Sequence, residues 1–175
     1  MFKIGDKVVY GKAGVCTVLD ICKMPSPFGL DDDMNGDFYK LQPLYDKQNI
    51  IYISTNNEKI MMREVMSPEK ADYLINNIDK YPPVYPKDER ERRNFIKETL
   101  NCDDMSKWVE LMNGLYREKQ RRRRFRKTLR YKDEKIYNFL EDFIFGELAV
   151  SLGISKAQVF DYIEDKVSKL GKTKA

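Results

Sequence analysis

The sequence contains no histidine. This absence excludes Ser-His-Asp triads, HExxH zinc sites and the commonest general base of enzymes. The sequence also has no P-loop and no GxGxxG motif, so the usual phosphate-binding loops of nucleotide enzymes are missing. We therefore expect a protein that is not an enzyme and that needs no cofactor.

Cysteine is scarce and long apolar runs are absent. Cys16, Cys22 and Cys102 are an odd number without CxxC spacing, which indicates reduced thiols in a cytoplasmic protein. No apolar run reaches about 18 residues, so we expect no membrane span. The first residues lack the apolar core of a signal peptide, and we expect none.

One cluster of carboxylates could suggest a metal site. Residues 31–33 are three consecutive aspartates in a segment rich in glycine, asparagine and proline. Their spacing is not that of a calcium-binding loop. We interpret the segment as a solvated loop and expect no metal.

The charges of the 175 residues are unevenly distributed. Charged residues make up 34% of the chain and hydrophobic residues 42%, which is typical of a globular protein. Residues 1–66 carry 8 basic and 9 acidic side chains, whereas residues 67–175 carry 24 and 19. The basic excess of the second part favours an acidic partner such as nucleic acid.

The first part of the chain has the pattern of short strands joined by turns. Gly5-Asp6 precedes a β-branched and aromatic run at 7–10, and a glycine-containing turn at 11–14 leads to a return strand at 15–19. A long loop is expected over 20–37. Further strands are expected at 38–45, 50–53 and 60–65. This spacing predicts a small antiparallel β-barrel over residues 1–64.

The second part has the pattern of helices. Ser67 followed by Pro68 is a helix start, and the proline-rich segment 80–86 is a stiff connector. Apolar residues then recur at helical spacing in several segments. Trp108 lies on one of these apolar stripes, so we expect it in the core. The prediction is an α+β protein in which an all-helical domain of about five helices covers residues 67–175.

Two motifs carry a resemblance to a known family. The pattern F-x-I-G-D-x-V-V-Y, with its glycine turn and return strand over 2–18, resembles the CarD-like regulators of bacterial RNA polymerase. Transcription-repair coupling factors share this module. Gly11 stands where the family has proline after the tyrosine. The segment 145–149, F-G-E-L-A, is similar to the family's G-E-L-A motif in its helical domain.

The resemblance implies a fold, two partners and a set of contact residues. It implies a Tudor-like or SH3-like barrel that binds the RNA polymerase β subunit and a helical domain that contacts promoter DNA, so that the open complex is modulated. The implied polymerase-binding residues are Met24, Ile51, Tyr52 and Ile53. In the family a tryptophan after the connector wedges into the minor groove. Residues 87–90 contain none, and Tyr85 is the nearest aromatic candidate for a wedge.

The densest basic cluster lies between the predicted helices. Residues 117–132 hold ten Lys and Arg against one acid, Glu118. Such charges repel one another, and DNA phosphates would relieve the repulsion. A solvated helix end and loop is the alternative. The candidate DNA-binding residues, with phosphate contact as the expected mode, are Arg90, Arg92, Arg93, Arg121, Arg122, Arg123, Arg124, Arg126, Lys127 and Arg130.

Two other functions remain open from the sequence. The spacing of apolar residues over 149–163 is that of a helix-turn-helix, whose recognition face would present Lys156, Gln158 and Asp161. Two packed helices joined by a tight turn would have the same spacing. The third hypothesis is a module that binds protein or RNA and has no role at promoters.

Overall fold

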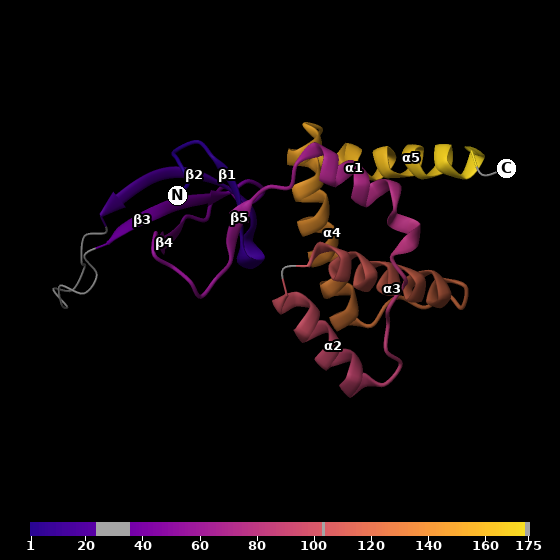
Figure 1. Ribbon diagram of the computed structural model, residues 1–175. Coiled ribbons are helices and arrows are strands. Elements are labelled where there is room, and N and C mark those ends of the chain that lie inside the picture. Colours follow the sequence, from indigo (N-terminus) through magenta and orange to yellow (C-terminus); the bar gives the residue numbers. More distant parts are fainter. Residues whose placement is uncertain (24–35, 103, 174–175) are drawn as a thin grey trace. The chain divides into compact units, whose positions relative to one another are not determined.

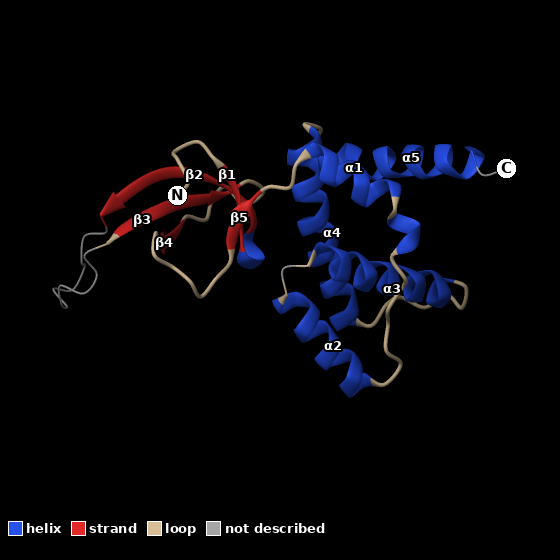
Figure 2. Ribbon diagram, viewed as in Figure 1, coloured by secondary structure: helices blue, strands red, loops and turns tan. Residues whose placement is uncertain are grey.

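The protein divides into two compact units, Met1–Val65 and Met66–Ala175. The computed structural model describes residues 1–23, 36–102 and 104–173, and the side chains up to residue 169 (Figure 1). The β-strands belong to the first unit and the α-helices to the second (Figure 2). Met24 and the carboxylate cluster at 31–33 lie outside the described residues. The expected α+β fold is confirmed.

The described residues of the first unit form one antiparallel sheet of five strands. The strands are β1 (Lys7–Tyr10), β2 (Gly14–Lys23), β3 (Asp37–Pro43), β4 (Ile51–Ser54) and β5 (Met62–Glu64). Their order in the sheet is β4-β3-β2-β1-β5. In the part of the chain that is described, β4 and β5 are edges and do not pair with each other. The sheet is therefore open, whereas the sequence suggests a barrel.

One face of the sheet builds the core of this unit. Residues at alternate positions supply it: Val8 and Tyr10 from β1, Cys16 and Val18 from β2, and Tyr39 and Leu41 from β3. Alternation places these side chains on the same face of a pleated sheet. Burial raises the pKa of the Cys16 thiol to about 11, so this cysteine remains a protonated packing residue.

The loop expected over 20–37 begins later than the sequence suggests. Val18 pairs with Leu41 and Asp20 with Lys40, so Leu19 is the extra residue of a β-bulge. Beyond the bulge, β2 continues to Lys23. The reason is apolar packing, because Ile21 rests against the core cluster and keeps the strand in register with Tyr39.

Five α-helices make up the second unit over the residues that the structure describes, as expected. They are α1 (Pro68–Asn76), α2 (Glu89–Asn101), α3 (Met105–Arg123), α4 (Tyr131–Leu152) and α5 (Val159–Thr173). Ser67 Oγ accepts a hydrogen bond from the Lys70 amide, and the Asp88 carboxylate accepts from the first amides of α2. Gly153 ends α4 with φ 66°, in the left-handed region.

Trp108 lies in the core of the helical unit, which confirms the expectation. It is 6% exposed, and its ring centroid is 4.4 Å from that of Phe143 on α4. Its indole nitrogen donates a hydrogen bond of 2.9 Å to the Cys102 carbonyl, so its polar atom is satisfied. Leu111 and Leu115 of α3 and Leu140 and Ile144 of α4 are fully buried as well.

The segment that enters the helical unit is held by the G-E-L-A motif. Glu147 has no exposed surface, and its carboxylate accepts a 3.0 Å hydrogen bond from the Met66 amide. A buried carboxylate is stable only where hydrogen bonds replace its water. The motif thus ties the first residue of the unit to the middle of its core.

The proline-rich connector crosses α3 at a glycine. The Val84 amide donates to the Glu110 carbonyl at 3.1 Å, and Asn113 Nδ2 donates to the Tyr81 carbonyl at 3.2 Å. A Cβ atom at Gly114 would overlap the carbonyl group of Val84. Only glycine permits this approach of two backbones.

Replacement of Trp108 should destabilise the helical unit. Trp108→Ala removes a large buried side chain and should lower the free energy of unfolding by about 3–5 kcal/mol. Urea unfolding followed by circular dichroism measures this loss. Trp108→Phe keeps most of the ring packing and should cost less. An unchanged unfolding midpoint for Trp108→Ala would contradict the core assignment.

Gly114→Ala tests the crossing of the connector. Alanine in a helix normally stabilises it by about 1 kcal/mol relative to glycine. Here the added Cβ meets backbone, so we expect the opposite sign, a loss of about 1–3 kcal/mol. Asn138→Ala on the exposed side of α4 is the control and should be close to neutral. A stabilised Gly114→Ala variant in the same urea titration would show that the connector does not need this contact.

Candidate functional site

The edge strand β4 carries one exposed side chain, that of Tyr52. Tyr52 is 43% exposed and lies opposite Lys40 of β3, whereas Ile51 and Ile53 pack against the core cluster. Of the polymerase-binding residues that the resemblance implies in β4, Tyr52 is thus the exposed one. Met24, the fourth residue of that set, is outside the described part of the chain.

A second apolar residue accompanies Tyr52. Ile50 directly precedes β4 and is 38% exposed. Side chains two residues apart in an extended chain share a face, so Ile50 extends the surface of Tyr52. The candidate residues in β4 did not include Ile50, although the period of two was visible in the sequence. We call Ile50 and Tyr52 the β4 surface.

The basic residues 117–132 run from the last turns of α3 through a turn to the first residues of α4. Helix α3 continues to Arg123, and the chain then reverses at residues 124–126, with Arg126 at φ 56°. The Lys127 amide donates back to the Arg122 carbonyl at 3.0 Å. Leu129 is 5% exposed and anchors the return segment before α4 begins. The cluster is therefore an ordered turn between two core helices.

The arginines of this turn divide into two groups. Arg121 makes a bidentate pair with Glu118 at 2.7 and 2.8 Å, and this guanidinium holds the pKa of the Glu118 carboxyl below its usual range. Arg122 donates to the Thr128 carbonyl at 2.6 Å. The other candidates of the turn are exposed and make no ion pair with the described residues: Arg123, Arg124, Arg126, Lys127 and Arg130.

Arg92 is not a surface contact for DNA, so this prediction is corrected. It is 4% exposed, and its Nε lies 3.5 Å from the Asp133 carboxylate. Its guanidinium also donates to the carbonyls of Pro86 and Lys87. A buried arginine is retained where such partners surround it. Arg90 and Arg93, its neighbours on α2, are exposed.

The same cluster holds Tyr85, the candidate wedge. Its hydroxyl donates a 2.7 Å hydrogen bond to Asp133, and the Arg92 guanidinium carbon lies 4.9 Å from its ring centroid. Burial and the hydrogen bond to Asp133 raise the pKa of Tyr85 to about 12, so the phenol stays protonated. A wedge must be free to enter a base step. Tyr85 is instead a half-buried structural residue, which corrects the prediction.

The region expected to resemble a helix-turn-helix presents acids. Helices α4 and α5 are bent by 102°, which is within the range of that motif. However, Gln158 is engaged in a capping box with Ser155, and Lys156 Nζ lies 2.5 Å from the Asp142 carboxylate. Asp161, the third residue of the expected recognition face, is exposed and negative.

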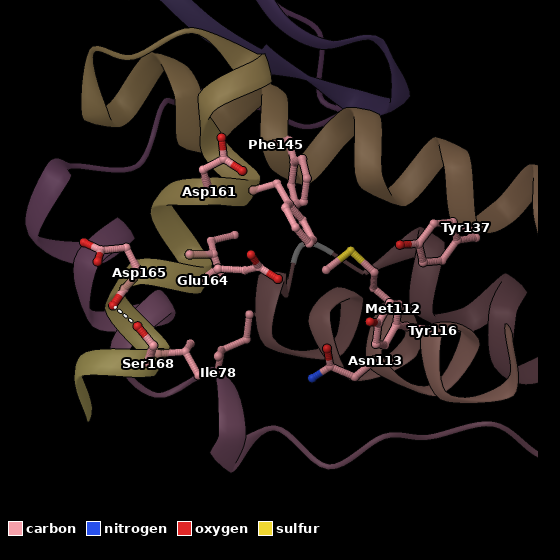
Figure 3. A pocket seen from close by; sticks show the side chains of 13 residues that line it. Ile78, Met112, Asn113, Tyr116, Tyr137, Phe145, Asp161, Glu164, Asp165 and Ser168 are labelled. Atoms are coloured by element: carbon pink, nitrogen blue, oxygen red, sulfur yellow. Dashed lines mark hydrogen bonds between the residues drawn. The ribbon is translucent and has the colours of Figure 1, made fainter. Parts of the chain in front are cut away.

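An apolar groove of about 810 Å³ lies beside this acidic face of α5. Met112 of α3 and Phe145 of α4 are among the side chains that line it, with Asp161, Glu164 and Asp165 along α5 (Figure 3). Phosphates would be repelled by these carboxylates. The turn after α3, which exposes Arg123, Arg124, Arg126, Lys127 and Arg130, is therefore the more favourable surface for an anion, and we call it the basic turn.

The described residues offer no metal site and no single helix that could span a membrane. They contain no group of three or more His, Cys, Asp or Glu side chains that could hold a metal ion. No single helix in those residues is long and apolar enough to cross a membrane, and α4 with α5 meets that test only as a bent pair.

Comparison with known proteins identifies the first unit. The family model of the CarD-like/TRCF RID domain matches residues 2–66, and no curated protein matches the chain. Domains of this family are interaction modules rather than enzymes, and RNA polymerase is the kind of partner that they bind. The matched range coincides with the five-stranded unit and includes both the opening hairpin and the β4 surface. The N-terminal unit of this protein is therefore a CarD-like/TRCF RID domain.

Proposed function

We propose that this protein is a CarD-like transcription regulator. Its RID domain binds the β subunit of RNA polymerase, and its basic helical unit contacts the backbone of promoter DNA. The protein thereby changes the stability of the open complex without chemistry of its own. The observation that carries this proposal is the RID match over residues 2–66.

The β4 surface supports the polymerase contact. An edge strand has free backbone groups on one side, which a partner strand can use, and side chains beside that edge supply specificity. Tyr52 and Ile50 are exposed beside this edge. A tyrosine offers a large contact area with little loss of conformational entropy, and such residues dominate many interfaces.

The basic turn supports the DNA contact. Its exposed cations, Arg123, Arg124, Arg126, Lys127 and Arg130, have no internal ion pairs to break within the described part of the chain. Because such cations would meet phosphates rather than base edges, binding would be weak in sequence preference and steep in salt. Arg90 and Arg93 on the exposed side of α2 remain further candidates.

Tyr52→Ala tests the polymerase contact in the full-length protein. Loss of a central interface tyrosine should weaken binding to core RNA polymerase about tenfold or more. Fluorescence anisotropy of the labelled protein measures the affinity. Tyr73→Ala is the matched control, because Tyr73 is 67% exposed on α1 in the other unit. Equal affinities of the two variants would remove the β4 surface from the interface.

A triple substitution in the basic turn tests the DNA contact. Arg123→Gln, Arg124→Gln and Lys127→Gln together should reduce the slope of log K against log salt by roughly 0.9 for each phosphate that the protein no longer neutralises. The affinity should fall about equally for duplexes of unrelated sequence. The control replaces the exposed Lys3, Lys7 and Lys12 of the RID domain by Gln. A reduced affinity for one duplex sequence alone would instead favour the helix-turn-helix hypothesis.

The same variants distinguish a regulator of the open complex from a module that binds protein or RNA without a role at promoters. A regulator of the open complex needs both contacts. The unaltered protein should therefore change the open-complex lifetime, and Tyr52→Ala and the basic-turn triple variant should each change it less. If neither the unaltered protein nor the variants change the open-complex lifetime, the protein is a module that binds protein or RNA and has no role at promoters.

A further inference from the structure

The connector and the end of α3 enclose a basic pocket. It has a volume of about 600 Å³ and lies where the proline-rich connector, the first turn of α2 and the basic turn come together. Six cationic side chains line it against one carboxylate, Glu118. We call it the basic pocket; its cations are Lys87, Arg92, Arg117, Arg121, Arg122 and Arg130.

Half of these cations are held by the protein. Arg92 is paired with Asp133, and Arg121 and Arg122 share Glu118, which is 10% exposed. These pairs fix the guanidinium groups in the wall of the pocket. Arg121 and Arg122 therefore have orientations that are set before any ligand arrives, which lowers the entropic cost of binding.

The other three cations are exposed and unpaired. Lys87 comes from the connector, Arg117 from α3 and Arg130 from the segment before α4. None of them makes an ion pair with the residues that the structure describes. Six cations against the two carboxylates Glu118 and Asp133 leave four positive charges in excess around one cavity.

The shape of the cavity depends on the close contact between Gly114 of α3 and Val84 of the connector. Gly114 lines the pocket together with Pro83 and Tyr85 of the connector, whose backbone at Val84 comes close to Gly114. The volume is within the range of about 300–1,000 Å³ that is usual for small-ligand sites. The cavity is thus sized for one small molecule.

We propose that the basic pocket binds a small polyphosphate ligand of the nucleoside diphosphate or triphosphate class through its phosphates. Guanidinium groups bind phosphate oxygens in bidentate fashion, and linked phosphates bring several negative charges into one cavity. A DNA phosphodiester brings a single charge at each phosphate and matches this excess less well. The proposal goes beyond DNA binding and does not depend on it.

Isothermal titration of the full-length protein with inorganic tripolyphosphate tests the pocket. The double variant Arg117→Gln/Arg130→Gln removes two unpaired pocket arginines, each worth about tenfold in affinity. The matched control Arg123→Gln/Arg124→Gln removes the same charge from the turn but outside the pocket lining. We expect tripolyphosphate binding to fall about 100-fold in the first double variant and less than threefold in the second. Circular dichroism checks that both remain folded.

Three results would overturn the proposal. Equal decreases in affinity for both double variants would show a diffuse charge effect. Tripolyphosphate that binds the unaltered protein no more tightly than orthophosphate would show that the cavity does not collect linked phosphates. ATP that binds more weakly than tripolyphosphate by more than tenfold would exclude a nucleotide as the ligand.

A DNA arm separates this proposal from the proposed function. A short duplex is titrated into the same proteins. In one outcome, neither double variant affects duplex affinity, but the pocket variant no longer binds tripolyphosphate. This result would support the polyphosphate proposal and contradict the proposed DNA contact at this turn. If the pocket variant is impaired in duplex binding alone, the cavity is a seat for a backbone phosphate, and the polyphosphate proposal is wrong.

Discussion

The basic side of the helical unit depends on one buried ion pair, that of Arg92 with Asp133. The pair joins the start of α2 to the start of α4, and Tyr85 joins the connector to it through Asp133. Removal of one buried partner would leave an unpaired charge in the interior, which is strongly unfavourable. Three segments that are distant in sequence are thus held at one point, and the basic pocket lies beside it, lined by the connector, the start of α2 and the end of α3.

This arrangement also explains how so many like charges can lie close together. Glu118 neutralises part of the charge of Arg121 and Arg122, and Leu129 fixes the return of the chain by burial. The remaining cations are exposed to water, where repulsion is screened. Folding is therefore secured by apolar and paired residues, and the exposed cations are left free for a partner.

Local signals in the sequence were sufficient to predict the element types. The helix start at Ser67 and Pro68, the end of α4 at Gly153 and the core position of Trp108 each depend on nearby residues or on helical period. The opening hairpin at 2–18 likewise identified the family of the first unit. The extension of β2 past Asp20 was missed, because it depends on a bulge and on packing with β3.

The site was less predictable than the fold. Arg92 and Arg93 are adjacent and identical in type, yet one is buried and the other exposed. The difference is set by Asp133, and Tyr85, which binds the same carboxylate, is 48 residues away from it. No pattern in the sequence relates these positions. Tyr52, in contrast, lies on the outer face of its strand, and this placement follows from its alternation with Ile51 and Ile53, which is a local property of the sequence.

The hydrogen bond between Met66 and Glu147 has a mechanical consequence. A protein held by polymerase at one unit and by DNA at the other would bear any strain along the single chain that joins the units. That strain would enter the helical unit at Met66 and pass directly to a fully buried residue in the C-terminal half of α4. The packed core, rather than the shorter helix α1, would therefore resist this strain. A tether of this kind can resist a pull without unravelling from its end.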